Sequence, residues 1–535
     1  IETDGLIRQG LSKLHCLVTK DMDTGEVKRY DSTGSHSSLT EGLKSLQAAS
    51  ELWGHNIQGY DIPALQTLYK GFSVNATLRD TLIFSRLFFT DLLDRDFRSK
   101  PANMPANLYG RHSLESWGHR LGIHKSEFGK QLDGDWSNYS PEMLEYCVQD
   151  VEVSVELAKM FEPKLEQYAG CIKTETELAT IMAWQESEGF HFDERKAEQL
   201  ESKLRTELDA LSDQMRSTFL FVDGGIFTPK RPNKTQGYVA EASMCKLKEF
   251  NPTSRHHIAW AFEQFRGWKP KEYTDAGKPK IDESVLKELN TPESLAFGRI
   301  LELQKHLGQL SEGKNAWLKL VHKGRIHHSC VLNTNTGRQA HMRPNVAQTP
   351  SSHEYRELYG PGPGRLQVGA DASGLELRCL GHYLSPFDHN AFAKEVVEGD
   401  IHTALADIYG TDRKSGKGVT YCLIYGGGNN KLGLTAGASK AGAAKKGAEI
   451  RKRIMEGLTG FAELSAAVSK RAQSGVLNGL DGRPIRLQGK QHAALNYLLQ
   501  SAGAVICKQW LLRSYELLTE AQIDYRPLAF VHDEL

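Results

Sequence analysis

Long apolar runs are missing from this chain. No stretch of roughly 18 consecutive apolar residues occurs, which argues against a transmembrane helix, and no signal peptide is visible at the start. The 66 basic and 66 acidic side chains cancel to a formal net charge of +0, so the composition argues against a uniformly basic nucleic-acid coat protein. Internal repeats and extended low-complexity tracts are absent too. The hydrophobic fraction of 39% and the mixed charge indicate a globular protein.

Cysteine is scarce and dispersed. The eight cysteines stand singly, with no CxxC pair and no His/Cys cluster at the spacing of a zinc site. This pattern argues against a disulfide framework and a zinc module. We expect reduced thiols in a cytoplasmic compartment.

The 535 residues are too many for one hydrophobic core and predict three to four domains. The first 160 or so residues are typical of an α/β domain, with strand-like segments at 14–18 and 26–30 around the turn signal Asp23-Thr24-Gly25. From about Thr174 the pattern becomes helical.

A long helix is predicted after Asp193, a good N-cap residue. Its apolar stripe consists of Leu200, Leu204, Leu208, Leu211 and Met215. Residues 223–240 then predict a flexible basic loop, and helical periodicity returns at 283–322. Short strands and turns are expected from about Gly324 onward.

One segment combines cations and aromatic rings at helical spacing. If residues 413–426 are helical, one face carries Arg413, Lys417, Tyr421 and Tyr425 at i,i+4 intervals. Two cations can hold the oxygens of a triphosphate, and the rings beyond them can stack on a base. Further lysines and arginines up to Arg453 favour a polyanionic partner for this segment.

Two aspartates stand at the ends of strand-like segments. Asp371 follows Leu366-Gln367-Val368, and Asp533 follows residues 528–531. Carboxylates brought together on one sheet form a rigid platform for two divalent cations, which can activate a hydroxyl and stabilise a leaving pyrophosphate. Without metal, repulsion would raise one pKa of the pair, so a bound cation is expected in the working site.

These segments resemble motifs A, B and C of family A, the DNA polymerase I-like DNA polymerases. The three motifs are residues 371–378, 413–426 and 532–534, in the expected order. Weaker matches lie at 336–338 with 344–348, at 400–403, at 480–483 and at 496–504. The residues of these motifs are most similar to those of replicative polymerases of short-tailed bacteriophages. The resemblance runs through nearly the whole chain.

The N-terminal part resembles a DEDDy-type 3′–5′ exonuclease. Its three motifs are matched by Glu2, by His55-Asn56-x4-Asp61 and by Tyr146-x3-Asp150. Tyr146 and Asp150 are one helical turn apart, so both can face the same metal site. In such enzymes carboxylates hold two cations and the tyrosine orients the attacking water.

The resemblance implies an α/β multidomain fold. An RNase H-like exonuclease domain at 1–165 would precede a right-hand polymerase. In that polymerase a thumb region at 166–320 contains the short basic loop 223–240, fingers occupy 379–495, and the palm is made of 321–378 and 496–535.

The resemblance also assigns roles to individual residues. Asp371, Asp533 and the carbonyl of Ala372 would bind metal in the polymerase site, and Glu2, Asp61 and Asp150 in the exonuclease site, with Tyr146 catalytic. Arg413, Lys417 and His402 would contact the incoming triphosphate, with Tyr425 near the templating base. Glu376 and Tyr421 would lie at the sugar and exclude a 2′-hydroxyl. The primer–template contacts would come from Arg338, Gln348, Gln500 and His532.

Cofactors and partners follow from the same resemblance. Each active site would use two Mg²⁺ ions, with Mn²⁺ as a substitute. Primer–template DNA and dNTPs would be the substrates, a replicative helicase–primase a partner, and phage DNA replication in the cytoplasm of an infected bacterial host the setting. No membrane association is expected.

Three departures from the family pattern modify these expectations. The chain lacks an initiating Met, and the first exonuclease motif needs an Asp two residues before Glu2, so we expect a fragment that degrades DNA poorly; Asp4 is on the wrong spacing. The short 223–240 segment disfavours host thioredoxin as a partner. The return strand after the turn at 532–534 would lie beyond Leu535, so the palm is expected to be truncated.

Two other classes remain open. A single-subunit phage RNA polymerase shares the order of motifs, but it would lack the exonuclease motifs and carry Ser at the position of Glu534. A nuclease or DNA-binding protein on a degenerate polymerase scaffold is the second alternative, although nothing in the three polymerase motifs is altered. A plain structural DNA-binding protein explains none of the carboxylates.

Overall fold

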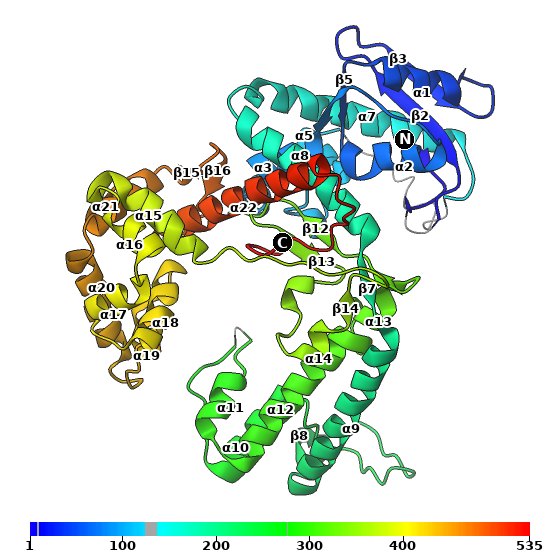
Figure 1. Ribbon diagram of the computed structural model, residues 1–535. Coiled ribbons are helices and arrows are strands. Elements are labelled where there is room, and N and C mark those ends of the chain that lie inside the picture. The colour runs from blue at the N-terminus through cyan, green and yellow to red at the C-terminus, as the bar shows by residue number, and fades with distance from the viewer. Residues whose placement is uncertain (8–9, 124–135, 275) are drawn as a thin grey trace. The chain divides into compact units, whose positions relative to one another are not determined.

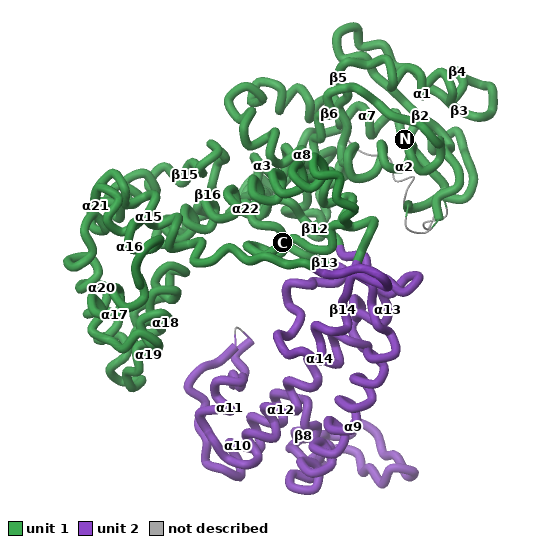
Figure 2. The backbone as a smooth tube through the Cα atoms, viewed as in Figure 1, with its two compact units in different colours: residues 1–189, 329–342, 368–535 green, residues 190–328, 343–367 purple. Residues whose placement is uncertain are grey.

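The computed structural model describes residues 1–7, 10–123, 136–274 and 276–535. It divides into two compact units (Figure 2). The first comprises residues 1–189, 329–342 and 368–535, and the second comprises 190–328 and 343–367. No helix among the described residues combines the length and the apolarity that a membrane crossing requires.

The first unit begins with a four-stranded sheet in the order β1-β2-β3-β4. Its strands are β1 (Glu2–Thr3), β2 (Leu14–Lys20), β3 (Val27–Asp31) and β4 (Ser37–Ser38). β2 is apolar and its first five residues are buried, as expected for a central strand. The two strands predicted at 14–18 and 26–30 are therefore confirmed as β2 and β3, which pair antiparallel.

The same part of the first unit also contains several helices and a separate parallel strand pair (Figure 1). The pair is β5 (Glu51–Gly54) with β6 (Thr77–Asp80). The helices are α1 (Leu39–Ala48), α2 (Ile62–Leu68), α3 (Thr81–Phe88), α4 (Leu92–Ser99), α5 (Leu114–Leu121) and α7 (Pro141–Phe161). Ser140 caps α7 and Pro141 occupies its first turn, where a missing N–H costs nothing. α7 packs on β2 through a cluster that includes Cys16 and Cys147.

The rest of the first unit is mainly helical. Its helices are α8 (Ala169–Glu188), α15 (Leu375–Asp388), α16 (Ala391–Glu398), α17 (Ile401–Tyr409), α18 (Arg413–Ile424), α19 (Asn429–Thr435), α20 (Ala443–Gly457), α21 (Phe461–Ala472) and α22 (Ala494–Glu520). Two short hairpins accompany them: β12 (Ser329–Val331) with β13 (Ala340–Met342), and β15 (Val476–Asn478) with β16 (Pro484–Arg486).

The helix predicted over the basic-aromatic segment is confirmed as α18. The side chain of Asp412 caps it by accepting from the backbone N–H of Ser415 at 3.0 Å. Gly416 lies where α18 crosses α17, and a methyl group built on it would be 2.6 Å from the Cβ of Ala406. The glycine therefore permits a close helix contact that a larger residue would prevent.

Residues 366–368 and 528–531 do not form the two strands expected before the aspartates. Leu366 and Val368 are 92% and 86% exposed and belong to no strand. In their place the structure has isolated bridges that pair Glu534 with Asp371 and with Val531. Strands are stabilised when their side chains pack against neighbouring residues, and these exposed apolar side chains do not. The pairing is therefore limited to the residues around the aspartates.

In the second unit, helix α9 (Glu194–Thr218) confirms the predicted stripe. Asp193 caps it, and four of the five stripe residues are buried, with Leu211 partly so. α9 packs on α12 (Pro292–Leu307), where Arg299 pairs with Glu207 at 2.7 Å. Neighbouring helices are α10 (Arg255–Arg266), α11 (Glu283–Leu289), α13 (Trp317–Leu320) and α14 (His353–Arg356). A sheet in the order β10-β11-β7-β14 joins β10 (Val321–His322), β11 (Arg325–Ile326), β7 (Phe190–Phe192) and β14 (Tyr359–Gly360).

The prediction of a flexible loop at 223–240 is wrong in part. β8 (Phe221–Phe227) pairs antiparallel with β9 (Met244–Glu249), and an isolated bridge joins Asn233 to Tyr238. The Gly224-Gly225 step coincides with an irregular register between Asp223 and Ile226, because glycine accommodates a bulge. The two glycines that predicted a loop therefore lie in a bulged strand of a hairpin. The sequence pattern alone did not distinguish this strand from a loop.

Candidate functional site

Asp371 and Asp533 lie on adjacent backbone segments of the first unit. The N–H of Ala372 donates to the carbonyl of Asp533 at 2.9 Å, and the N–H of Leu535 donates to Ala370 at 2.9 Å. A tight turn closes the second segment, with two hydrogen bonds of 2.9 and 3.0 Å between Val531 and Glu534. Two acids that are far apart in the sequence are thus held side by side.

The electrostatics of the pair favour a cation. Burial raises the pKa of Asp533, and the negative charges of Asp371 and Glu376 raise it further. Asp371 itself is exposed. Carboxylate oxygens that repel one another are the hard ligands that Mg²⁺ and Mn²⁺ prefer, so the donor set fits a divalent metal site.

The predicted face of α18 is directed at this acidic region through its aromatic residues. Arg413 and Lys417 are exposed, and the rings of Tyr421 and Tyr425 stack at a centroid distance of 6.4 Å and an interplanar angle of 21°. Burial raises the pKa of Tyr421, and the carboxylates of Glu376, Asp533 and Asp371 add to the rise. The hydroxyl of Tyr421 therefore lies within electrostatic range of all three acids.

Glu376 is a buried acceptor beside these residues. It is 5% exposed on α15, and its Oε1 accepts from Arg338 at 2.9 Å and from the hydroxyl of Tyr425 at 2.6 Å. Partial burial and this carboxylate raise the pKa of Tyr425 to about 12. Tyr421 was predicted to act with Glu376 at the sugar, whereas the hydrogen bond from Tyr425 was not predicted.

Asp400 is a neighbour of the cationic face that the sequence analysis did not assign. It accepts from Arg413 at 2.8 and 3.2 Å and also caps α17 through the N–H of Thr403. His402, on the same helix, has its ring 6.4 Å from that of Tyr421, and burial with the charges of Lys417 and Arg413 lowers its pKa. The sequence feature that could have identified Asp400 is its position as a helix N-cap two residues before His402, a predicted triphosphate contact.

Comparison with known proteins decides the family. Residues 231–535 match the model described as DNA polymerase family A. The chain belongs to DNA polymerase family A. It is 32% identical to the DNA-directed DNA polymerase of Escherichia phage T7 and 31% identical to that of Enterobacteria phage T3, and each match covers 100% of this chain and 92% of the relative.

A solved structure supports the same fold for this family A polymerase. It is the POL domain of Pol1 from M. smegmatis in complex with DNA primer-template and dNTP, with a TM-score of 0.70 and 16% identity. The match covers 97% of this chain and 88% of that one. At this identity the likeness concerns the fold alone.

The residues predicted to contact DNA are distributed over both units of the polymerase. Arg338, Gln500 and His532 lie in the first unit, whereas Gln348 lies in the second, where its carbonyl accepts from the side chain of Gln309 at 3.2 Å. His532 occupies the left-handed region with φ 60° in the turn beside Asp533, and its ring is 6.3 Å from that of His341. Burial and the charge of Arg338 lower its pKa.

The three acids of the predicted exonuclease site also converge in this family A chain. Glu2 is in register with Cys16 on the sheet, Asp61 ends a π-helical turn at Ile57–Asp61, and Asp150 lies on α7. Burial raises the pKa of Glu2, and the charges of Asp150 and Asp61 add to the rise. These carboxylates therefore share one partly buried region, together with Tyr146 one turn earlier on α7.

Asp4 has a different role in the polymerase. Its carboxylate accepts from the backbone N–H groups of Ser12 at 3.0 Å and Lys13 at 2.9 Å. It stabilises the turn that leads into β2, in agreement with its wrong spacing for the exonuclease motif.

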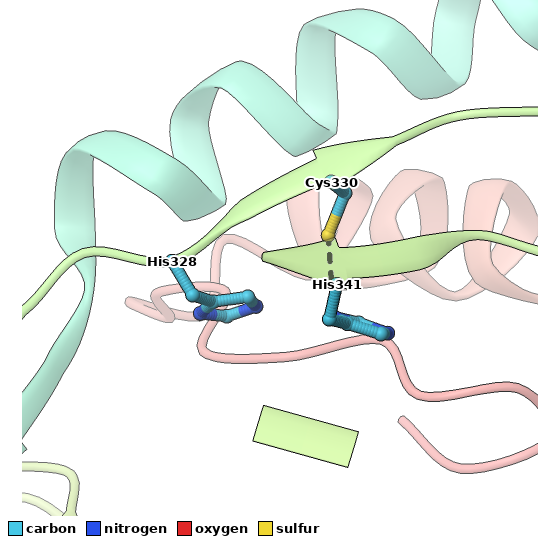
Figure 3. Close-up of side chains that lie close together, drawn as sticks. All are labelled: His328, Cys330 and His341. Atoms are coloured by element: carbon cyan, nitrogen blue, oxygen red, sulfur yellow. Dashed lines mark hydrogen bonds between the residues drawn. The ribbon is translucent and has the colours of Figure 1, made fainter. Parts of the chain in front are cut away.

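The hairpin β12–β13 brings a cysteine and a histidine together, although no zinc-like spacing is present in the sequence. The Sγ of Cys330 lies 3.3 Å from Nδ1 of His341, as Figure 3 shows beside His328, two residues before Cys330. Burial raises the pKa of Cys330 to about 12 and lowers that of His341 to about 4. Both side chains are therefore neutral near pH 7.

Proposed function

We propose that this family A polymerase adds deoxynucleotides to a primer 3′ end as directed by a DNA template. The observation that carries the proposal is the pairing of the Asp371 and Asp533 segments beside the basic-aromatic face of α18. The oxygen of the primer 3′-hydroxyl attacks the α-phosphorus of a dNTP and gives up its proton to water. A new P–O bond forms, the bond between the α-phosphorus and the α,β-bridging oxygen breaks, and pyrophosphate leaves with that oxygen and its electron pair.

Asp371 and Asp533, with the carbonyl of Ala372, hold the divalent cations in this proposal. When bound there, two Mg²⁺ or Mn²⁺ ions supply Lewis-acid activation of the attacking hydroxyl and stabilise charge on the pyrophosphate. The raised pKa of Asp533 supports this role, because unpaired like charges need a counter-ion.

The side chains around the acids bind and orient the nucleotide. Arg413 and Lys417 are exposed cations one helical turn apart, which suits the oxygens of a triphosphate, and His402 lies beside them. Tyr421 and Glu376 lie at the sugar and limit the space beside it, and Tyr425 stacks on Tyr421. Arg338, Gln348, Gln500 and His532 contact the primer–template.

The test is primer extension by the full chain. We would incubate it with an end-labelled primer–template, Mg²⁺ and four dNTPs, and compare Asp533→Ala with Asp524→Ala. Asp524 is a matched control, because it is an exposed acid of the same segment that pairs with Arg526 at 2.8 Å. We expect extension by the parent and the control and none by Asp533→Ala. Primer shortening without extension would favour a nuclease on a silent polymerase scaffold.

We also propose that residues 1–165 form a 3′–5′ exonuclease domain. Glu2, Asp61 and Asp150 would hold its metal ions and Tyr146 would orient the attacking water. The convergence of the three acids and the raised pKa values of Glu2 and Asp61 support a cation site. The remaining limits, thumb 166–320, fingers 379–495 and palm 321–378 with 496–535, are part of this proposal.

The exonuclease site can be tested by metal binding, independently of activity. In a chain with Asp371→Asn and Asp533→Asn, Mn²⁺ titration followed by electron paramagnetic resonance should reveal sites that Asp150→Asn removes. Asp4→Asn is the control, because Asp4 serves a turn, and it should leave Mn²⁺ binding intact. Binding that Asp150→Asn does not change would contradict the assignment.

Primer–template DNA and dNTPs are the proposed substrates, and phage DNA replication with a helicase–primase is the proposed setting. The full-length similarity to two phage polymerases supports this setting. The name of the structural neighbour, which includes a primer-template and a dNTP, is consistent with these substrates.

A further inference from the structure

Four ionisable side chains form a buried network in the first unit: Glu175, Asp481, Arg483 and Lys508. Glu175 and Lys508 have no exposed surface, and Arg483 is 2% exposed. One oxygen of Glu175 lies 2.5 Å from Lys508 Nζ and 2.7 Å from a guanidinium nitrogen of Arg483. Arg483 also pairs with Asp481 at 2.6 Å. Two positive and two negative charges thus compensate one another, which buried charges require.

The network is hydrogen-bonded to a segment that precedes Arg338. Lys508 Nζ donates to the carbonyl of Leu332 at 3.1 Å, and Arg483 donates to Oδ1 of the buried Asn333 at 3.1 Å. A methyl group built on Gly337 would lie 2.6 Å from a guanidinium nitrogen of Arg483. The guanidinium therefore lies directly against Gly337 and also binds Asn333, four residues earlier.

The turn itself is closed and ends at Arg338. The N–H of Thr334 donates to the carbonyl of Arg338, and the N–H of Gly337 donates to Thr334, both at 2.9 Å. Gly337 has φ 82°, a conformation in which other residues are strained. These hydrogen bonds fix the backbone of Arg338 relative to Thr334, the residue that follows Asn333.

Arg338, the last residue of this turn, connects it with the proposed sugar site. Its guanidinium donates to Oε1 of Glu376 at 2.9 Å. A series of contacts therefore runs from Glu175 and Asp481 through Arg483 to Asn333, which precedes the turn Thr334–Arg338, and from Arg338 at the end of that turn to Glu376.

We propose that Arg483 is a positioning residue for sugar selection, which fixes Arg338 through Asn333 and thereby holds the carboxylate of Glu376 against the ribose of the incoming nucleotide. The inference rests on the proposed function, because Glu376 can discriminate sugars only if a nucleotide binds beside it. It adds a residue with no contact to nucleotide or metal to the determinants of selectivity.

A network that only stabilises the fold would behave differently. It would lower stability and total activity when weakened, but it would change insertion of deoxyribonucleotides and ribonucleotides by the same factor. A positioning role changes the ratio of the two. The informative quantity is therefore the ratio of kcat/KM for a dNTP to that for the matching rNTP.

The experiment uses the full chain and two substitutions at one site. Asn333→Ala removes the acceptor for Arg483 and also the 3.2 Å bond from Asn333 to the carbonyl of Arg86. Asn333→Asp keeps an acceptor for Arg483 and loses only that second bond. We expect the ratio to fall on the order of tenfold for Asn333→Ala, the effect of about one hydrogen bond, and to be restored in Asn333→Asp.

Arg486→Met is the control for general destabilisation. Arg486 follows Arg483 on the same hairpin, but it donates to the carbonyl of Phe88 at 2.9 and 3.0 Å and lies 3.3 Å from Asp91. It should lower the melting temperature and leave the ratio unchanged. In an Arg338→Ala background, Asn333→Ala should have no further effect on the ratio, because the connection is already broken.

The outcomes separate the two claims. If the parent chain extends no primer, the proposed function fails and the inference fails with it. If the parent extends primers and prefers dNTPs, but Asn333→Ala leaves the ratio at the parental value or Arg486→Met lowers it equally, the positioning role alone is overturned.

Discussion

The hydroxyl of Tyr425 donates a 2.6 Å hydrogen bond to the buried carboxylate of Glu376, which also accepts from Arg338. This bond joins the C-terminal end of α18 to the start of α15. The residue proposed to limit the sugar is therefore held from two sides. The position of Tyr425 at the end of α18 therefore bears directly on the support of Glu376.

Tyr425→Phe should weaken sugar selection. The substitution keeps the ring that stacks on Tyr421 and removes the donor to Glu376, so the carboxylate is held by Arg338 alone. A hydrogen bond to a charged group contributes about 1.5–3 kcal/mol, and partial compensation by water leaves an expected loss of roughly tenfold in the dNTP-to-rNTP ratio. Single-turnover insertion measures it. An unchanged ratio would show that Arg338 alone is sufficient to hold the carboxylate of Glu376 for sugar selection.

Tyr421→Phe should restore discrimination against chain terminators. A phenolic hydroxyl at this position can stand in for the missing 3′-hydroxyl of a dideoxynucleotide, so the parent is expected to incorporate terminators readily. Loss of that hydroxyl should lower the ddNTP-to-dNTP ratio by on the order of a hundredfold. Competitive incorporation on a sequencing template gives the ratio for both variants. Equal ratios would remove Tyr421 from this role.

Gly416→Ala should destabilise the polymerase although alanine favours helices. A Cβ at this position would be 2.6 Å from the Cβ and 3.0 Å from the Cα of Ala406. Overpacking costs about 1–3 kcal/mol, more than the roughly 1 kcal/mol that alanine gains over glycine in a helix. Gly418→Ala is the control, since its nearest neighbour is a side-chain methyl of Thr435 at 3.0 Å, which can rotate away. A higher melting temperature for Gly416→Ala would contradict the packing argument.

Local patterns predicted the helices well. The stripe of α9 and the cation-aromatic face of α18 repeat at helical spacing, so both helices were predicted from the sequence; the N-cap Asp193 was predicted too, whereas the N-cap Asp412 was not. The strands predicted before the two aspartates do not form: Leu366 and Val368 are apolar yet exposed, and only isolated bridges occur around Asp371. A hydrophobic residue in the sequence carries no information on whether another segment will cover it.

The candidate site was predicted through motifs, and the contacts between motifs were not. Nothing in the sequence indicates that Tyr425, one helical turn after Tyr421, donates to Glu376, or that Asp400 holds Arg413. Asp481 and Arg483 belong to the weaker match at 480–483, but their pairing with Glu175 and Lys508 was not predicted, because these residues come from segments far apart in the chain. Pairings of this kind depend on tertiary structure alone.

His112 should make the first unit sensitive to mild acid. Its Nδ1 lies 2.7 Å from the hydroxyl of Ser85, which accepts from the indole N–H of Trp117 at 2.9 Å, so the hydroxyl donates to a neutral imidazole. Burial, with the charges of Arg86 and Arg120, lowers the pKa of His112 to about 3 from an ordinary value near 6.5.

The sign of the effect follows from proton binding. Between pH 6.5 and about 3 the unfolded chain binds a proton at His112 that the folded chain does not, so the free energy of unfolding falls as the pH drops through this window. At pH 5 the loss is about 2 kcal/mol, from roughly 1.4 kcal/mol for each pH unit below 6.5. His112→Gln cannot titrate, and its melting temperature should therefore fall less than that of the parent between pH 7 and pH 5. His382→Gln, at an exposed position on α15, should follow the parent. If His112→Gln and the parent lose the same number of degrees, the imidazole is not the group that confers acid sensitivity.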